Sequence, residues 1–207
     1  MPWNALVFLL TLSTLAVFYF WRNGYLHWYG DAAAHLNIAR RILDGRNPGY
    51  EQIGTVWLPL PHLLMMPFAS VDALWQSGLA GAIPSAICFV AAGLLLFLIA
   101  RHCFDCHQAA WCGLLLFALN PNLLYLQSLA MTEAIFVCVI LLTLYASLRQ
   151  NPWLAGFGLL AASMTRYEGW FLIPFVVLYF FRTSRHVVTK KAVSGTASIM
   201  PRMPPKA

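Results

Sequence analysis

Charged residues are scarce in this sequence. Asp, Glu, Lys and Arg make up 10% of the 207 residues, against roughly 25% in typical soluble domains. A water-soluble globule of this size could not cover itself with so few charged side chains, and hydrophobic residues make up 60% of the chain. The composition disfavours a soluble enzyme, a disordered chain and a nucleic-acid-binding domain. It favours an integral membrane protein with several spans, whose partners include the lipid bilayer and no nucleic acid.

The common catalytic signatures are also missing. There is no Gly-rich phosphate loop, no Ser-His-Asp order, no HExxH pattern and no internal repeat of fixed period, and the last absence disfavours an inverted-repeat transporter. The run from His102 to His107 holds two Cys and two His. A structural zinc site takes its ligand pairs from segments about a dozen residues apart, and six consecutive residues cannot easily wrap a tetrahedral ion. We therefore interpret this run as a polar turn between two spans.

Six apolar stretches are candidate membrane spans, because a spanning helix needs about 20 mostly apolar residues. The sequence thus predicts an all-α polytopic membrane protein with about six transmembrane helices. The first span ends in an aromatic cluster at 18–21, typical of the membrane interface. A cleavable signal peptide is the competing interpretation, but no basic region precedes the run. The expected spans are residues 4–21, 79–100, 109–126 (interrupted by Asn120-Pro121-Asn122), 134–148, 154–164 and 170–181.

The long segment between the first two spans is mixed in character. Its residues 31–44 repeat apolar side chains at helical spacing, with polar residues on the opposite face, which predicts an amphipathic surface helix. Gly45 and the turn at 47–49 would end that helix. The stretch from 54 to 68 is apolar but broken by prolines, and we interpret it as a re-entrant or interfacial piece.

The short loops predict the orientation. With the N-terminus in the cytoplasm, most cations at span ends are cytoplasmic, which obeys the positive-inside rule. This orientation places both termini in the cytoplasm and residues 23–76 outside. We expect the protein to lie in the plasma membrane. The basic, Pro-containing tail, 183–207, has no apolar periodicity, and we expect it to be disordered next to a transmembrane module formed by 1–182. The cytoplasmic cations would be Arg101, Arg149, Arg182, Arg185, Lys190 and Lys191.

Several ionisable residues share the outer face in this orientation, as a site assembled from loops would. Asp31 opens the amphipathic helix, where it is either an N-cap or a general base for a hydroxyl group. His35 follows one turn later and could bind a metal with Asp31, bind a phosphate, or be a plain interfacial residue. The outer-face set is Asp31, His35, Glu51, His62, Glu133, Arg166 and Glu168.

The other outer residues also allow two interpretations. His62 follows a proline beside an apolar run and is ambiguous. Glu133 begins the fourth span, where an acid favours the helix N-terminus. Arg166 and Glu168 either satisfy each other, or Arg166 clamps a phosphate, for which its guanidinium geometry is well suited.

The order of these features resembles the GT-C superfamily of membrane glycosyltransferases, which includes protein O-mannosyltransferases and aminoarabinose transferases. The resemblance covers residues 1 to 182 and implies a polyprenyl-phosphate-linked sugar donor, a protein or glycan acceptor, and in some relatives a divalent metal. It rests on four segments taken together, Tyr29-Gly30-Asp31 through Gly45, Thr55 through His62, Met131-Thr132-Glu133, and Met164 through Trp170.

The resemblance implies a role for each candidate. Asp31 would deprotonate or orient the acceptor hydroxyl, Arg166 would hold the donor phosphate, and Glu133 and Glu168 would line the same cavity. His35 and His62 would lie on the donor or substrate side, with the metal question open.

Two departures from the family pattern stand out. Family first loops often carry adjacent acids, whereas Ala32 follows Asp31. Family members are also longer, so we expect an N-terminal portion that is catalytically incomplete alone. A transporter or flippase would instead carry charge at mid-membrane depth, and a noncatalytic scaffold would leave the acidic and basic candidates unclustered.

Overall fold

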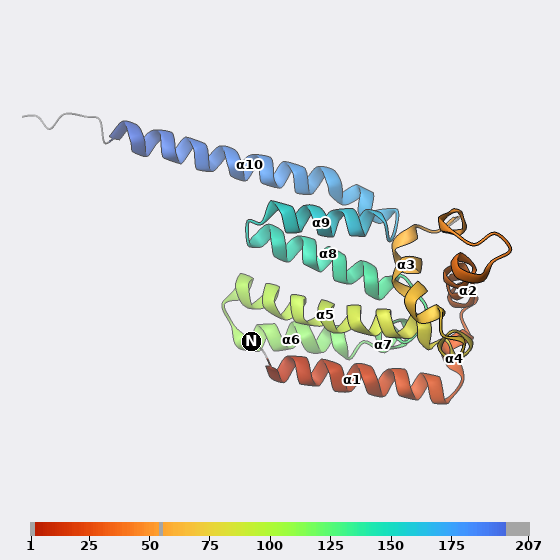
Figure 1. Ribbon diagram of the computed structural model, residues 1–207. Helices are drawn as coiled ribbons and strands as arrows, with labels where there is room; N and C mark the ends of the chain where they lie inside the picture. Colours follow the sequence, from red (N-terminus) through yellow and green to blue (C-terminus); the bar gives the residue numbers. More distant parts are fainter. Residues whose placement is uncertain (1–2, 54–55, 198–207) are drawn as a thin grey trace, which may run out of the picture.

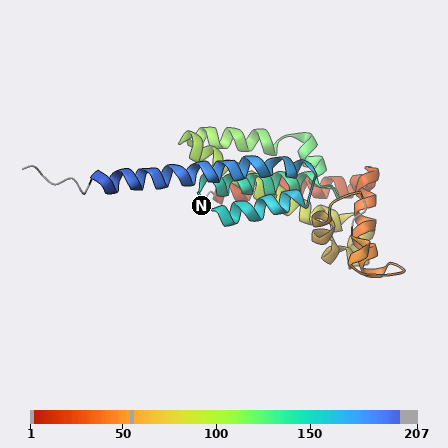
Figure 2. The same ribbon diagram turned by 90° about the horizontal axis from the view of Figure 1, so that it is seen from above.

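The computed structural model describes residues 3–53 and 56–197, and the regular structure in these ranges is helical (Figure 1). The longer helices lie roughly side by side as a bundle, and α2, α3 and α4 gather at one end of it (Figures 1 and 2). The bundle helices are α1 (Trp3–Arg22), α5 (Leu79–Phe104), α6 (His107–Ala118), α8 (Glu133–Leu148), α9 (Pro152–Ser163) and α10 (Glu168–Ala197). The short elements are α2 (Gly30–Asp44), α3 (Pro59–Ala69), α4 (Asp72–Ser77), α7 (Pro121–Leu126), and the 3₁₀ turns η1 (Tyr25–His27) and η2 (Tyr50–Gln52).

Helix α5 is the centre of the bundle and packs against α1, α6 and α8. Small residues permit close contacts along it. A Cβ atom on Gly81 would meet the backbone of Ala130, and one on Gly93 would meet the side chain of Leu9. Small residues at helix interfaces let backbones approach closely, as packing inside a membrane requires.

Two buried clusters form the core. One lies at the end that holds α2 and α3 and includes Leu36, Met65 and Ile135, and the other joins α1, α5 and α6 around Phe89 and Phe97. The end with α2 and α3 thus has a buried core of its own. Residues of a site at this end are therefore held in place by packed helices.

Two helices of the described residues, α1 and α5, are long and apolar enough to cross a membrane. The six expected spans are therefore not confirmed. The third apolar stretch is divided at the interruption expected from the sequence. Helix α6 ends at Ala118, and Asn120 caps α7, its side chain accepting bonds from the backbone N–H groups of Asn122 and Leu123. Helices α8 and α9 are apolar but shorter than 18 residues.

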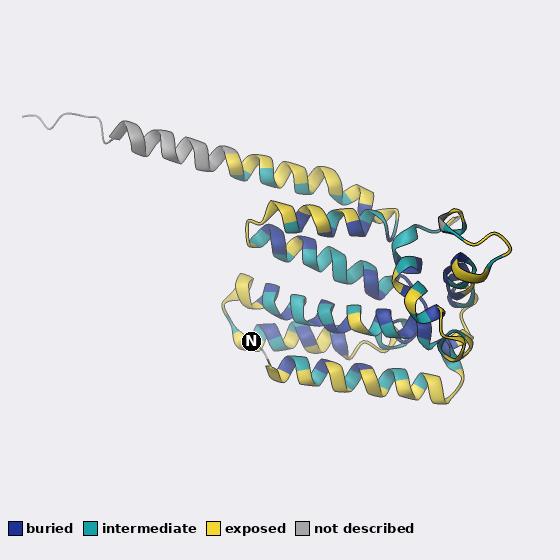
Figure 3. Cartoon of the chain, in the orientation of Figure 1, coloured by how far each residue is buried: buried dark blue, intermediate teal, exposed yellow. Residues whose placement is uncertain are grey.

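Many residues of the outer helices of the bundle are nevertheless exposed (Figure 3), and a large share of them are large apolar residues. Phe171 and Phe175 of α10 are 75% and 68% exposed, and Trp153 of α9 is 89% exposed. Patches of this size on a soluble protein would be an interaction surface, whereas lipid covers them in a membrane. Together with α1 and α5, they indicate an integral membrane protein.

The elements at the end of the bundle match the sequence pattern well. The amphipathic helix expected over 31–44 is α2, with Ala32, Leu36 and Ala39 buried and Leu43 exposed. Pro59 stands at the start of α3, where its missing N–H costs no hydrogen bond. Helix α10 extends past the boundary expected at residue 182 and ends at Ala197. Residues 198–207 of the expected tail lie outside the described residues.

Candidate active site

A cavity of about 380 Å³ lies where α2, the segment before α3, the α7–α8 loop and the α9–α10 loop meet. These four segments are far apart in the sequence and converge at one end of the bundle (Figure 1). A concave site with several convergent polar groups is the usual setting for ligand binding. Its lining residues are Tyr29, Asp31, His35, Trp57, Leu58, Asn122, Leu126, Met131, Thr132, Glu133, Thr165, Arg166, Tyr167 and Glu168.

Five of the six site residues expected from the sequence line this cavity, namely Asp31, His35, Glu133, Arg166 and Glu168. His62 lies directly behind His35. Glu51, the further acid of the expected outer face, is exposed on η2 and does not line the cavity.

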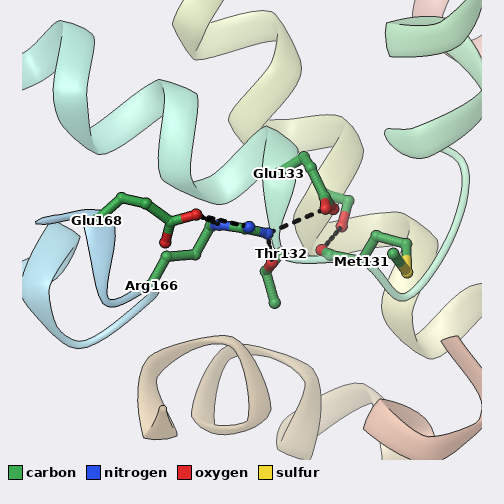
Figure 4. A network of polar contacts seen from close by, with 6 residues as sticks. Met131, Thr132, Glu133, Arg166 and Glu168 are labelled. Carbon is green, nitrogen blue, oxygen red and sulfur yellow. Dashed lines mark hydrogen bonds and ion pairs between the residues drawn. The ribbon is translucent and has the colours of Figure 1, made fainter. Parts of the chain in front are cut away.

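Arg166 connects the two loops that contribute most of the charge (Figure 4). Its Nη1 donates to the Thr132 hydroxyl and to Glu133 Oε1, both at 3.1 Å. Its Nε and Nη2 donate to Glu168 Oε1, at 3.3 and 2.9 Å. These four bonds use four of the five guanidinium N–H groups. A phosphate therefore gains full access to Arg166 by displacing a carboxylate.

The two glutamates of this network are not equivalent. The Glu168 side chain is 58% exposed, and its hydrogen bond from Arg166 lowers the pKa of that carboxyl. The Glu133 side chain is 30% exposed, and its Oε2 atom is buried without a hydrogen-bond partner. Thr132 is the N-cap residue of α8, so Glu133 lies in the first turn, where the helix dipole favours its negative charge.

Asp31 lies in the first turn of α2 and is exposed to the cavity. Helix α2 begins at Gly30 with Tyr29 as its N-cap residue, and no side-chain cap is present. The Asp31 carboxylate is therefore not used as a helix cap. A carboxylate in this position can accept a proton from a hydroxyl group bound in the cavity.

His35 and His62 form a buried pair behind the cavity. His35 Nδ1 and His62 Nε2 are 2.8 Å apart, and the residues are 2% and 0% exposed. Burial lowers the pKa of His35, with Arg166 adding to the effect and Asp31 opposing it. Burial, followed by the nearby His35, lowers the pKa of His62 to about 4. Both rings are therefore neutral at pH 7.

The described residues contain no group of three or more His, Cys, Asp or Glu side chains placed to hold a metal ion. The donor set around the cavity thus does not fit the divalent metal that the resemblance allows, and we derive no step through one. The run from His102 to His107 forms the turn between α5 and α6, as expected, with Asp105 at a φ of 46°.

Sequence reasoning missed the uncharged residues of the site. Thr132 bonds Arg166, and Trp57, Tyr29 and Tyr167 line the cavity. Thr132 precedes Glu133 and Tyr167 precedes Glu168. Their positions next to predicted site residues could therefore have identified both as site residues. Tyr29 and Trp57 carried no such signal, because tyrosine and tryptophan are common at every membrane interface.

A family model described as dolichyl-phosphate-mannose-protein mannosyltransferase matches residues 64–203. The matched range includes Glu133, Arg166 and Glu168, whereas Asp31 and both histidines precede it. No curated protein and no solved structure matches the chain.

Proposed function

Because this chain belongs to the dolichyl-phosphate-mannose-protein mannosyltransferase family of GT-C-type membrane glycosyltransferases, we propose that it transfers a sugar from a polyprenyl phosphate to a hydroxyl group of a protein. The transfer takes place outside the cytoplasm, at the plasma membrane, with both termini cytoplasmic. The residues that we assign to the reaction lie within the transmembrane module of residues 1–182. One observation supports the proposal most strongly: Asp31, Glu133, Arg166 and Glu168 come from three separate segments and line one cavity.

In this mechanism Asp31 acts as the general base. Its carboxylate accepts the proton of the acceptor hydroxyl as that oxygen attacks the anomeric carbon of the donor sugar. The bond between the anomeric carbon and the phosphate oxygen breaks, and the phosphate takes the electron pair. Direct displacement inverts the configuration at the anomeric carbon.

Arg166 stabilises the phosphate as it leaves. Charge grows on the phosphate oxygens in the transition state, and a guanidinium group fixed in a partly desolvated cavity interacts strongly with that charge. Glu133 and Glu168 hold the guanidinium in place beforehand. The exposed apolar faces of α9 and α10 keep the bundle in the lipid that supplies the donor.

The clustering separates this proposal from a noncatalytic scaffold. A scaffold has no need to bring three carboxylates and one arginine into one cavity, since charges at span ends are satisfied by water. Here Arg166 bonds residues 33 and 34 positions away in the sequence.

The test is transfer of mannose from dolichyl-phosphate mannose to acceptor peptides by the full chain in lipid vesicles. Replacing a general base typically costs about 10²- to 10⁴-fold in rate, so Asp31→Asn should lose at least 100-fold. Glu51→Gln is the matched control, because Glu51 is an exposed acid of the same polar segment outside the cavity. It should transfer within about twofold of the wild type. Equal rates for the wild type and Asp31→Asn would disprove the assignment of the base.

A further inference from the structure

The buried histidine pair has a geometry that requires a shared hydrogen. His35 Nδ1 and His62 Nε2 are 2.8 Å apart, and their ring centroids are 5.0 Å apart. Two neutral imidazoles at this distance form one hydrogen bond, with one ring donating and the other accepting. The direction of that bond decides whether the other nitrogen of His35, Nε2, carries a hydrogen or a lone pair.

The two directions leave different groups on His35. If His35 Nδ1 donates to His62 Nε2, His35 Nε2 keeps its lone pair, and in the other direction His35 Nε2 carries the hydrogen. His62 Nδ1 is buried without a hydrogen-bond partner among the described residues. The first direction gives the cavity wall a fixed acceptor, and the subsite inferred below requires it.

The wall that His35 contributes to the cavity also contains an aromatic ring. The Trp57 ring centroid is 4.7 Å from that of His35, and both residues line the cavity. An aromatic face beside a fixed acceptor suits a sugar ring, which presents C–H groups on one face and hydroxyl groups at its edge. Pockets that bind small molecules commonly combine apolar walls with a few fixed polar groups in this way.

We propose that Trp57 and His35 form the subsite for the sugar ring of the donor, with His35 Nε2 accepting a hydrogen bond from a sugar hydroxyl. In the same proposal His62 is a positioning residue that holds His35 in this tautomer and orientation. The proposal rests on the proposed function, because it needs a donor that carries a sugar. It assigns the sugar to the α2 and α3 side of the cavity and leaves the phosphate to Arg166.

Burial separates the donor sugar from the acceptor in this assignment. His35 is 2% exposed, whereas Asp31, one turn earlier on α2, is exposed. A protein acceptor reaches the cavity from water and meets Asp31 first. The small sugar ring is the group that can lie against His35.

The neutral state of the pair supports the subsite. Burial keeps the pKa of both histidines below its usual range, so each ring is neutral at pH 7 and keeps one nitrogen with a lone pair. The charged groups that act on the pair are Asp31, which opposes this lowering at His35, Arg166, which adds to it there, and Arg41, which adds to it at His62.

The experiment compares two lipid probes on the full chain in vesicles, dolichyl-phosphate mannose and dolichyl phosphate. We expect the wild type to bind the mannosylated lipid more tightly. His35→Phe keeps a planar ring but removes the acceptor, so it should lose about tenfold in affinity for the mannosylated lipid, the effect of one good hydrogen bond. Affinity for dolichyl phosphate should not change. His102→Phe, an exposed histidine at the other end of α5, is the matched control and should match the wild type.

A second pair of variants tests the positioning role of His62. The amide oxygen of His62→Gln can still accept from His35, so this variant should keep the preference for the mannosylated lipid to within about threefold of the wild type. His62→Phe has no acceptor and should behave like His35→Phe. If all three variants lose affinity for both lipids, the pair is purely structural and the inference is overturned.

The outcomes separate this inference from the proposed function. If the wild type prefers the mannosylated lipid and His35→Phe keeps the full preference, the sugar subsite is wrong and the proposed donor stands. If the wild type binds both lipids equally, the proposed donor fails and the subsite fails with it.

Discussion

Two arginines near the same end of the molecule are each held by two carboxylates, but only one of them faces the cavity. Both sites use an acid close in sequence and another from a different element, so the ion pairs alone do not distinguish them. The four pairs are Arg40–Asp44 at 2.5 Å, Arg40–Asp72 at 2.7 Å, Arg166–Glu133 at 3.1 Å and Arg166–Glu168 at 2.9 Å.

The remaining contacts of the two arginines differ. Arg40 also donates to the Ala69 carbonyl at 2.8 Å and lies 5.2 Å from the Trp75 ring, so it ties α2 to α3 and α4. Arg166 lines the cavity, and its partner Glu133 keeps a buried oxygen without a hydrogen bond. The contacts of Arg40 hold helices together. Beside Arg166, in contrast, a buried carboxylate oxygen without a hydrogen bond lies next to a cavity, as expected where a ligand binds.

The largest expected effect comes from removing each arginine in turn. Arg166→Gln should lower mannose transfer by about 100-fold or more, because removing one fixed donor to a developing oxyanion typically costs this much. Arg40→Gln should stay within about threefold of the wild-type rate but should unfold at a lower temperature, because it loosens α2 from α3 and α4. The rate of transfer and the thermal unfolding midpoint of both variants check this. Similar rates for the two variants would remove the distinction between the arginines.

The next largest effect on transfer is expected from replacing one carboxylate partner of each arginine. Glu133→Gln should lower transfer by about tenfold, because it weakens the hold on Arg166 and replaces a buried carboxylate oxygen with an amide. Asp72→Asn should remain within about twofold, because the Asp72 side chain is 71% exposed and exposed ion pairs contribute little. The same transfer assay measures both. A larger loss in Asp72→Asn than in Glu133→Gln would contradict the comparison.

The sequence predicted the charged part of the cavity and the helix that carries Asp31. Ionisable residues at the ends of apolar runs are costly in lipid, so their assembly on one face could be inferred without coordinates. The apolar spacing of 31–44 predicted α2 because a 3.6-residue period leaves one face to bury. Both inferences depend on patterns that are local in the chain.

Contacts between distant residues could not be predicted in the same way. His35 and His62 are 27 residues apart, and each was ambiguous by itself, because nothing in either neighbourhood specifies the other as its partner. The engagement of Arg166 with Thr132 and Glu133 depends on how α8 and the α9–α10 loop pack. The break at Asn120-Pro121-Asn122, by contrast, was predicted from the sequence, and Asn120 caps a new helix there.

The smallest expected effect concerns the charge that each arginine exerts on His35. Arg166 lowers the pKa of His35, although burial is the larger cause and Asp31 acts in the opposite direction. Removing a positive charge favours the protonated ring. Arg166→Gln should therefore raise the pKa of His35, while burial keeps it below its usual range. Arg40→Gln should not change it, since Arg40 is not among the charges that act on this ring.

The direction of this change carries over to ligand binding. Protonation of His35 Nε2 removes the lone pair that the sugar subsite requires, so the preference for dolichyl-phosphate mannose is lost as the pH falls through the pKa of His35. In Arg166→Gln the loss should begin at a higher pH than in the wild type. Titrating the His35 ring by NMR in micelles measures the shift without any need for transfer. A shift to lower pH, or an equal shift in Arg40→Gln, would show that Arg166 does not act on the subsite and would place the two arginines in the same class.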